Sequence, residues 1–475
     1  MAKLCGQAAD VMIRAASLVI MSRLLDPKDF GLVAMVTVVT GLYGLFITAG
    51  LSEATVQAPA ITDRQLSLLF WINIAVGIVL ALACVLSAPI LVKFYDEPRL
   101  FWMTVAVGLG FVINAASVQH SALLQRQMRY VALALVETTS QSAGFVVGVA
   151  MAVAGLGYWA IIGAALASPA VYAVCVWTAA KWIPGLPHRN VEIRSMLRFG
   201  GTVTLNTFIV YFAYNFEKVL LGRFWGPDIL GLYGRAYQLI NFPTGSLNSA
   251  IGGVMFSALS RVQDEPIRFR SYFLKGYTLV NSLTIPITVF SAIFAGDIVA
   301  VCLGPKWIEA APIFRLLTPT IMILGIINPT AWLLLSLGLY GRSLRLALVL
   351  SPLVITSYVI GLPYGPTGVA FAFSSAMVLW LVPHILWCVH GTPISPKDIV
   401  LAISRPFLSA LFAGSVSFAT QYYVTQLPTP ILRVALGAGV FAIVYSFVLL
   451  FAAGQHKLYL ELFRGLRMSS SADGK

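Results

Sequence analysis

Charged side chains inside very apolar segments are the residues of this chain whose types could do chemistry. Arg14 lies in the first apolar segment, and Lys218 lies near the end of the seventh. A guanidinium or ammonium group in such a position can bind the oxygen atoms of a phosphate. Glu137 and Glu217 lie in two further apolar segments, where a carboxyl group can carry a proton. These residue types indicate binding of an anionic group, with the two glutamates as candidates for proton or ion coupling.

Arg14, Lys218 and Glu217 also have a purely structural interpretation. Arg14 is spaced i, i+4 from Asp10, so the two can neutralise each other as the helix inserts. Lys218 is close enough to the end of its segment to extend its ammonium group to the membrane surface. Glu217 points about 100° away from Lys218 on a helix and can instead serve as a partner for a neighbouring helix. Both interpretations stay open for each of these three residues.

Polar and small residues form two stripes at helical spacing. The first stripe comprises Thr204, Thr207, Tyr211, Asn215 and Lys218. The second stripe comprises Asn241, Gly245, Asn248 and Gly252. A polar helix face can line a sugar-binding cavity, whereas small residues four positions apart also permit close packing of helices. We predict substrate contacts at Arg14, Tyr211, Asn215, Lys218, Asn241 and Asn248.

The pattern R-x3-P-x3-G-L occurs twice, 200 residues apart. Its fixed positions are Arg23, Pro27 and Gly31 in the first copy and Arg223, Pro227 and Gly231 in the second. Each copy joins the end of one apolar segment to the start of the next. Similar stretches at 112–116 and 326–330, and at 155–160 and 366–370, extend the duplication to a six-helix unit. We expect the two hairpins either to anchor helix ends or to guard the outer gate of a cavity.

Composition identifies the medium in which these segments fold. The chain has 475 residues, of which 59% are hydrophobic and only 10% are charged. Such a chain cannot cover the surface of a soluble protein with charge. The net charge of +13 is spread singly and in pairs between apolar segments, which argues against nucleic-acid binding and for helix ends at a membrane surface. The five cysteines form no C-x-x-C pair, and we expect no metal site, cofactor or cleavable signal.

Fourteen segments are long and apolar enough to be membrane-spanning helices. They are residues 4–22, 31–52, 67–92, 101–123, 130–153, 157–180, 199–221, 229–258, 276–302, 311–338, 343–361, 366–389, 399–421 and 431–454. We therefore expect an all-α integral membrane protein with two parallel six-helix bundles around a central cavity and two more C-terminal helices. The expected parts are an N-terminal bundle at 1–190, a second bundle at 191–392, the additional helix pair at 393–455 and a cytoplasmic tail at 456–475.

The distribution of Lys and Arg predicts the orientation of these helices. If the N-terminus is cytoplasmic, about 20 of these residues fall on the cytoplasmic side and about 10 on the other side. This bias favours a cytoplasmic location for both termini. It also places both copies of the repeated hairpin on the outer side of the membrane.

Several stretches resemble a known family. They include S-R-L-L-D-P-K-D-F-G-L at 22–32 and the segments 50–54, 123–130, 221–237 and 259–264. In these stretches the chain resembles the polysaccharide transporter family of the multidrug/oligosaccharidyl-lipid/polysaccharide exporter superfamily. Glu217 departs from the family pattern, in which we expect aspartate.

The resemblance implies a flippase of the bacterial inner membrane. Such a protein moves undecaprenyl-pyrophosphate-linked oligosaccharide repeat units by alternating access, for synthesis of exopolysaccharide, capsule or the O-antigen of lipopolysaccharide. The implied partners are the lipid-linked oligosaccharide, membrane lipid, and a polysaccharide polymerase with its export machinery.

Three other functions are compatible with a set of membrane helices. A small-molecule or drug exporter of the same superfamily is the nearest alternative, but it would need acidic cavity charge for cationic substrates. A membrane enzyme needs a sizeable external loop or an acidic catalytic cluster, and neither is apparent in the sequence. A structural scaffold would need no buried charge. We therefore expect a transporter and not an enzyme.

Overall fold

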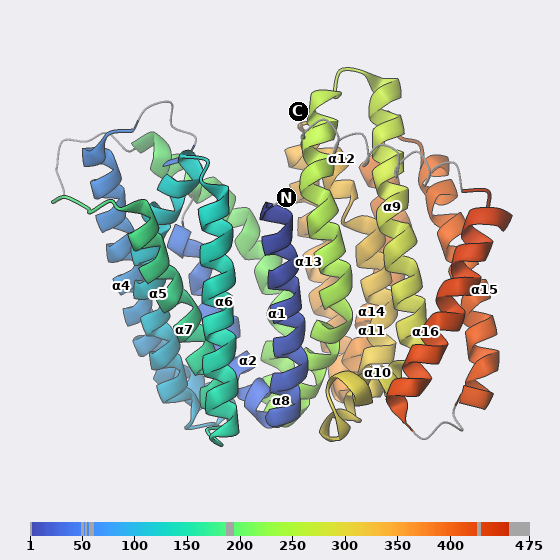
Figure 1. The fold of residues 1–475 in the computed structure, drawn as a ribbon, viewed down its shortest axis with the longest axis horizontal. Coiled ribbons are helices and arrows are strands. Elements are labelled where there is room, and N and C mark those ends of the chain that lie inside the picture. Colours follow the sequence, from blue (N-terminus) through green and yellow to red (C-terminus); the bar gives the residue numbers. More distant parts are fainter. Residues whose placement is uncertain are drawn as a thin grey trace. The chain divides into compact units, whose positions relative to one another are not determined.

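The computed structural model describes the backbone of residues 2–48, 52, 55–56, 61–186, 194–424 and 429–455. It describes the side chains of residues 9–47, 52, 55–56, 61–186, 211–420 and 429–455. Within these ranges every regular element is a helix, which confirms the predicted all-α class. Figure 1 shows long helices that run in similar directions within each part of the chain.

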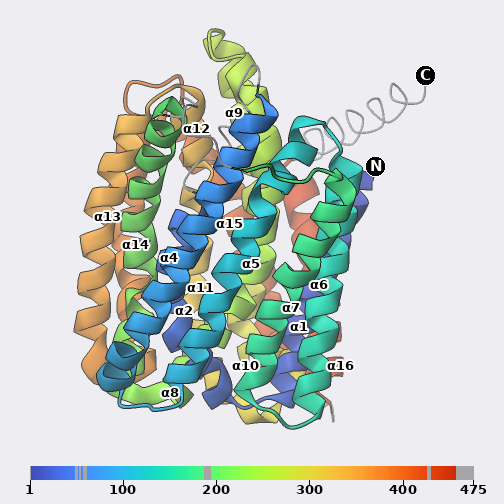
Figure 2. The same ribbon diagram turned by 90° about the vertical axis from the view of Figure 1, so that its left-hand side faces the viewer.

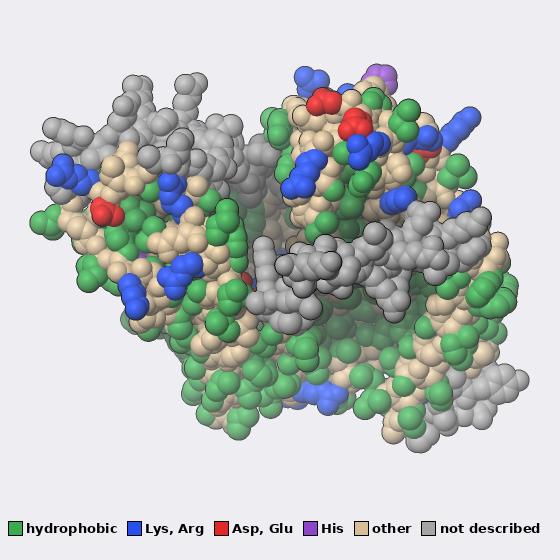
Figure 3. Space-filling view, turned by 45° about the horizontal axis from the view of Figure 1, so that its top comes forward, with side chains coloured by type: hydrophobic (Ala, Val, Ile, Leu, Met, Phe, Trp, Pro, Cys, Tyr) green, Lys and Arg blue, Asp and Glu red, His purple; other side chains and the backbone are tan. Residues whose placement is uncertain are grey.

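The described helices include ten that are long and apolar enough to cross a membrane. One of the ten, Tyr340–Val389, combines two of the segments predicted from the sequence. The predicted total of fourteen therefore stays a prediction, while the multi-pass membrane character is clear. Figure 3 shows charged side chains gathered at the helix ends that face the viewer, with hydrophobic side chains on the flanks below them.

The first compact unit comprises residues 1–235 and 302–306. Its helices are α1 (Ala2–Leu24), α2 (Pro27–Thr48), α4 (Asp63–Tyr95), α5 (Leu100–Arg126), α6 (Tyr130–Val153), α7 (Tyr158–Ala180) and the first part of α8 (Arg194–Arg261). α4 packs along α5, α5 and α6 pack along α7, and α1 packs along α6 (Figure 2). Two of these contacts, α4 with α5 and α6 with α7, join sequence neighbours across short connections, whereas the other two join helices that are separated in the sequence.

The second compact unit comprises residues 236–301 and 307–475. After the remainder of α8 it contains α9 (Pro266–Ile293), nearly all of α10 (Ala295–Cys302), α11 (Ala310–Ile327), α12 (Thr330–Ser336), α13 (Tyr340–Gly361), η2 (Leu362–Tyr364), α14 (Gly365–Val389), α15 (Pro396–Val424), α16 (Pro430–Phe447) and η3 (Val448–Ala452). The short helix η1 (Pro305–Trp307) lies where the 302–306 segment of the first unit returns to the second. α11 and α13 pack on α14, and α9 and α16 pack on α15. The four-part division expected from the sequence has its boundaries at 190, 392 and 455 and stays a prediction.

Gly226 divides α8 into two helices that meet at a sharp turn. Its φ of 82° lies in the left-handed region, which residues with a Cβ rarely adopt. Pro227 follows directly, where its fixed φ suits the start of a helix. Pro27 begins α2 in the same way. Both copies of the repeated pattern therefore form helix–turn–helix hairpins, as the sequence indicates.

Pro329 interrupts the helix predicted at 311–338, so that α11 ends at Ile327 and α12 begins at Thr330. Proline has no N–H to continue the helical hydrogen bonds. The carbonyl of Ile326 instead accepts the hydroxyl of Tyr277 at 3.0 Å, and the carbonyl of Ile327 accepts the hydroxyl of Thr330 at 2.6 Å. Side chains thus satisfy backbone groups at the break, which water cannot reach inside a membrane.

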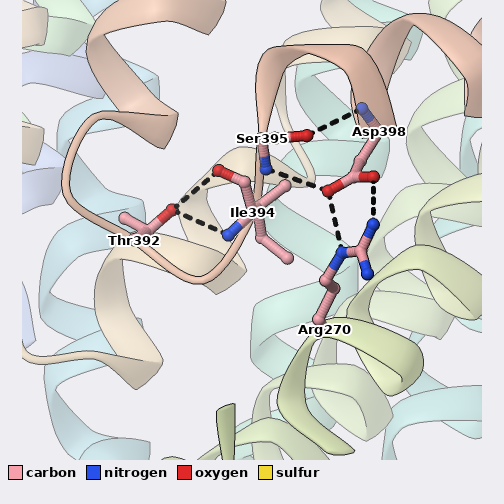
Figure 4. Close-up of polar contacts among 5 residues, drawn as sticks. All are labelled: Arg270, Thr392, Ile394, Ser395 and Asp398. Atoms are coloured by element: carbon pink, nitrogen blue, oxygen red, sulfur yellow. Dashed lines mark hydrogen bonds and ion pairs between the residues drawn. The ribbon is translucent and has the colours of Figure 1, made fainter. Parts of the chain in front are cut away.

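One end of α15 is fastened to α9 by an ion pair with two hydrogen bonds. Asp398, in the first turn of α15, accepts Nε–H of Arg270 at 2.9 Å and a second N–H of the same guanidinium at 2.5 Å (Figure 4). The N–H of Ser395 donates to the same carboxylate at 2.9 Å. The adjacent turn is closed by the N–H of Ile394, which donates to the hydroxyl of Thr392 at 3.3 Å.

A second ion pair fastens α16 to the short helix α10, which follows the end of α9. Arg433 of α16 contacts Asp297 of α10 at 2.7 Å. Further along α16, the hydroxyl of Tyr445 donates to the carbonyl of Ser282 in α9 at 2.7 Å. The two helices outside the sequence repeat are therefore an integral part of the second unit.

Replacing Arg270 with alanine is expected to lower the thermal unfolding midpoint of the detergent-purified protein. The change leaves Asp398, which is only 9% exposed, without its cationic partner. Arg268→Ala is the matched control, because Arg268 pairs with Glu265 on the surface, where the two side chains are 59% and 50% exposed and such pairs contribute little. Equal midpoints for the two variants would contradict the role of the Arg270–Asp398 pair.

Candidate functional site

Three of the predicted substrate contacts form a connected row on α8. The ammonium group of Lys218 donates to the side-chain oxygen of Asn215 at 2.6 Å. The side-chain NH₂ of Asn215 donates to the backbone carbonyl of Tyr211 at 2.8 Å. Lys218 uses one of its three N–H donors in this row, so two remain for another acceptor. The side chains of Thr204 and Thr207, which were expected to continue the row, lie outside the described residues.

The hydroxyl of Tyr211 is engaged with α2. It lies 3.1 Å from the carbonyl oxygens of both Thr37 and Val38. Gly41 makes this approach possible, because a Cβ added there would overlap the Tyr211 hydroxyl. Tyr211 therefore joins α8 to α2 and holds Asn215 beside that contact.

The charge of Lys218 is not neutralised by any carboxylate among the described side chains. Glu217 is adjacent in sequence but is buried, with 6% exposure, and one of its carboxylate oxygens has no hydrogen-bond partner. The two side chains occupy different faces of α8, as expected from helical geometry. A half-buried cation and a buried carboxyl group thus lie side by side in sequence without forming an ion pair.

Glu137, the other candidate for coupling, has different surroundings. Its side chain is exposed on α6. The sequence does not reveal this difference, because both glutamates lie inside apolar segments. Glu217 is therefore the more buried of the two carboxyl groups.

Arg14 of α1 is exposed and forms no ion pair with Asp10 in the described part of the chain. One carboxylate oxygen of Asp10 is buried without a hydrogen-bond partner. The alternative interpretation of these two residues as a self-neutralised pair is therefore not what the structure shows. The guanidinium of Arg14 keeps its donors available for an anion.

The second predicted stripe lies in the second unit, where its glycine and asparagine residues have different surroundings. Gly252 packs against Trp332, whose indole nitrogen lies 2.9 Å from the position of an added Cβ. The side-chain oxygen of Asn248 is buried without a hydrogen-bond partner, and Asn241 is half-buried beside Gly245. The predicted contacts are thus divided between the units: Arg14, Tyr211, Asn215 and Lys218 belong to the first, and Asn241 and Asn248 belong to the second.

The two copies of the repeated hairpin pack against each other reciprocally within the first unit. A Cβ added at Gly31 would overlap the carbonyl oxygen of Pro227, and a Cβ added at Gly231 would overlap that of Pro27. Each hairpin supplies one glycine and one proline carbonyl to the other. Glycine at both positions is what allows the two backbones to approach this closely.

Charged groups surround this contact. The guanidinium of Arg235 lies 3.6 Å from the centre of the Phe30 ring, within the range of a cation–π interaction. Lys306 contacts Asp26 at 2.6 Å and so attaches the 302–306 segment to the first hairpin. Sequence reasoning identified the repeat but missed Arg235 and Lys306, because only the fold brings them to the hairpins.

Known proteins resemble the chain over most of its length. The sequence matches the family described as "Polysaccharide biosynthesis protein" over residues 20–312. It is 26% identical over 412 residues to the lipopolysaccharide biosynthesis protein WzxC of Escherichia coli (strain K12), covering 84% of this chain and 82% of that protein. It is 22% identical over 438 residues to the succinoglycan biosynthesis transport protein ExoT of Rhizobium meliloti (strain 1021), covering 91% and 88%. The fold is similar to that of the lipid II flippase MurJ in an inward closed conformation, with a TM-score of 0.75, 14% identity, and coverage of 94% of this chain and 98% of that one.

Gly31→Ala is expected to destabilise the protein by about 1–3 kcal/mol, the usual cost of overpacking, because the new methyl group would overlap the Pro227 carbonyl. Gly44→Ala is the matched control in the same helix, since a Cβ there meets only a ring carbon of Phe111 at 3.9 Å. Thermal or denaturant unfolding of both variants measures the difference. A Gly31→Ala protein as stable as the control would show that the hairpin backbones are not in close contact.

Proposed function

Because this chain belongs to the polysaccharide biosynthesis protein family, we propose that it is a flippase for undecaprenyl-pyrophosphate-linked oligosaccharide repeat units. Relatives named for lipopolysaccharide and succinoglycan biosynthesis support the substrate class, and a flippase fold along nearly the whole chain supports the activity. The repeat units serve the synthesis of exopolysaccharide, capsule or O-antigen. We place the protein in the bacterial inner membrane with both termini in the cytoplasm, on the basis of the Lys and Arg bias.

The observation that carries this proposal is that Lys218 forms no ion pair with any carboxylate among the side chains that the structure describes. A cation in a membrane segment is costly unless it has an anionic partner. The described partner of Lys218 is only the neutral amide of Asn215. An incoming pyrophosphate would supply the missing negative charge and accept the two free N–H groups. A small-molecule exporter of cationic drugs would require the opposite sign of charge here.

Arg14 is the second cation proposed to contact the pyrophosphate. It belongs to the same unit as Lys218 and has no ion pair within the described ranges. A guanidinium can bind two phosphate oxygens at once. Amide groups such as those of Asn215, Asn241 and Asn248 are suited to sugar hydroxyls, while the polyprenyl tail stays in the lipid.

Transport then requires access to alternate between the two membrane faces. We assign the reciprocal contact of the repeated hairpins to the closed form of the outer gate. Arg23, Pro27 and Gly31 contribute one side of this gate, and Arg223, Pro227 and Gly231 contribute the other. The partners of the released repeat unit would be a polysaccharide polymerase and export machinery, and the chain itself would catalyse no covalent step.

Lys218→Gln is expected to slow flipping by about 10-fold or more, the range for losing a hydrogen bond to a charged group. Liposomes containing the purified protein and a fluorescent undecaprenyl-pyrophosphate sugar report the rate at which the sugar reaches the opposite leaflet. Lys181→Gln is the control, because Lys181 is an exposed lysine of the same unit at the end of α7. An unchanged rate in Lys218→Gln would contradict its role. Efflux of a cationic drug without flipping by the wild type would favour the exporter.

Glu217→Gln is expected to make transport insensitive to an imposed pH gradient, because the buried carboxyl group can no longer exchange a proton. Glu137→Gln is the comparison, since the side chain of Glu137 is exposed. The same liposomes, prepared with different internal and external pH, measure the effect. A gradient response retained by Glu217→Gln but lost by Glu137→Gln would assign coupling to the other glutamate.

A further inference from the structure

The two arginines of the repeated hairpins have different surroundings, although they occupy equivalent positions in the sequence. The stem of Arg23 lies against Gly304, where an added Cβ would be 3.6 Å from it. Arg223 is exposed, and its guanidinium lies 5.9 Å from the centre of the Phe94 ring. No carboxylate pairs with Arg223 in the described part of the chain. Both arginine side chains are exposed, and Arg223 is the one that lies beside Phe94 of α4.

A pocket of about 450 Å³ lies beside Phe94 on the same helix. It is lined by Pro89, Ile90, Lys93 and Phe94, which share one face of α4. Ile90 is 67% exposed and Phe94 is 41% exposed, so the wall of the pocket is an open apolar surface. Lys93 is also exposed, and no described side chain forms an ion pair with it. Two unneutralised cations thus border an apolar wall.

Two acidic residues follow Lys93 at the end of α4, Asp96 and Glu97, and neither forms an ion pair with it. Glu97 lies in the loop between α4 and α5, where its carboxylate contacts the guanidinium of Arg99 at 2.7 Å. Hydrogen bonding to Arg99 lowers the pKa of Glu97 below its ordinary value. The negative charge of Glu97 is therefore committed to Arg99.

Exposed aromatic rings indicate the level of the pocket in the membrane. Trp102, in the first turn of α5, is 66% exposed, and Phe224 and Trp225, at the turn of α8, are 66% and 43% exposed. Aromatic side chains at helix ends typically lie at the boundary between lipid and water. Lys93 is likewise two residues from the end of α4. The pocket is thus expected at the depth of the lipid phosphates.

We propose that Lys93 and Arg223 bind the phosphate of an anionic membrane lipid, whose acyl chain lies against Pro89 and Ile90. The opposite charges of the headgroup and the two side chains account for the polar part of the site. The open apolar wall can pack against the acyl chain of the lipid. A free phosphate ion has no apolar part that would contact this wall. Phe94 supports the guanidinium through its ring. The apolar wall of this site lies on α4, whereas Arg223 lies on α8, the helix that carries Lys218, and is also one of the residues assigned to the outer gate above.

The test is thermal unfolding of the purified protein in neutral detergent, with added phosphatidylglycerol or with phosphatidylcholine of the same acyl chains. Phosphatidylglycerol is expected to raise the unfolding midpoint of the wild type more than phosphatidylcholine does. The double variant Lys93→Gln/Arg223→Gln should lose at least half of this difference. Arg64→Gln is the matched control, because Arg64 is an exposed arginine in the first turn of α4, at its opposite end, and should respond like the wild type.

Two outcomes would overturn the proposal. The first is an equal response to phosphatidylglycerol in the wild type and in the double variant. The second is an equal rise in the midpoint with inorganic phosphate, which would identify an ion site rather than a lipid site. If the double variant does not fold, the two single variants give the same comparison, and each should lose part of the phosphatidylglycerol effect.

Discussion

Backbone contact between two glycines and two proline carbonyls positions the helices that carry the candidate site. Gly31 faces Pro227 and Gly231 faces Pro27, so each hairpin fits only where the other lacks a side chain. The first part of α8, which carries Lys218, enters this contact. Backbone atoms, unlike side chains, have no alternative rotamers, so this contact cannot be changed without moving the helices themselves. The place and direction of the polar stripe that ends at Lys218 therefore depend on it.

The same protein neutralises some cations and leaves others free, and this contrast identifies where an anion would bind. Arg270, Arg433 and Lys306 each have a carboxylate partner that joins separate elements of the fold. Lys218 is half-buried, and among the described side chains its hydrogen-bond partner is the amide of Asn215. Because lipid cannot screen such a charge as water would, an uncompensated cation at this position is poorly explained by stability alone. It is better explained by a ligand that brings negative charge when it enters.

Hydropathy predicted the helices well where polar residues mark their ends, as at 130–153, which matches the observed helix. It failed at 276–302, because α9 already begins at Pro266 and ends at Ile293. Arg268, Arg270 and Lys275 were counted as loop residues, yet charged side chains can extend from the end of a long helix. Side-chain partners were beyond sequence reasoning, since they depend on how helices rotate against one another. Two examples are the contact of the Tyr211 hydroxyl with the backbone of α2 and the absence of an ion pair between Asp10 and Arg14.

The most direct test of the role of Lys218 is an experimental structure of the protein in lipid nanodiscs with an undecaprenyl-pyrophosphate oligosaccharide bound. If Lys218 is the anchor of the anionic group, a pyrophosphate oxygen will lie about 3 Å from its ammonium nitrogen, at hydrogen-bond distance. A pyrophosphate bound elsewhere, with Lys218 still donating only to Asn215, would contradict the proposed site.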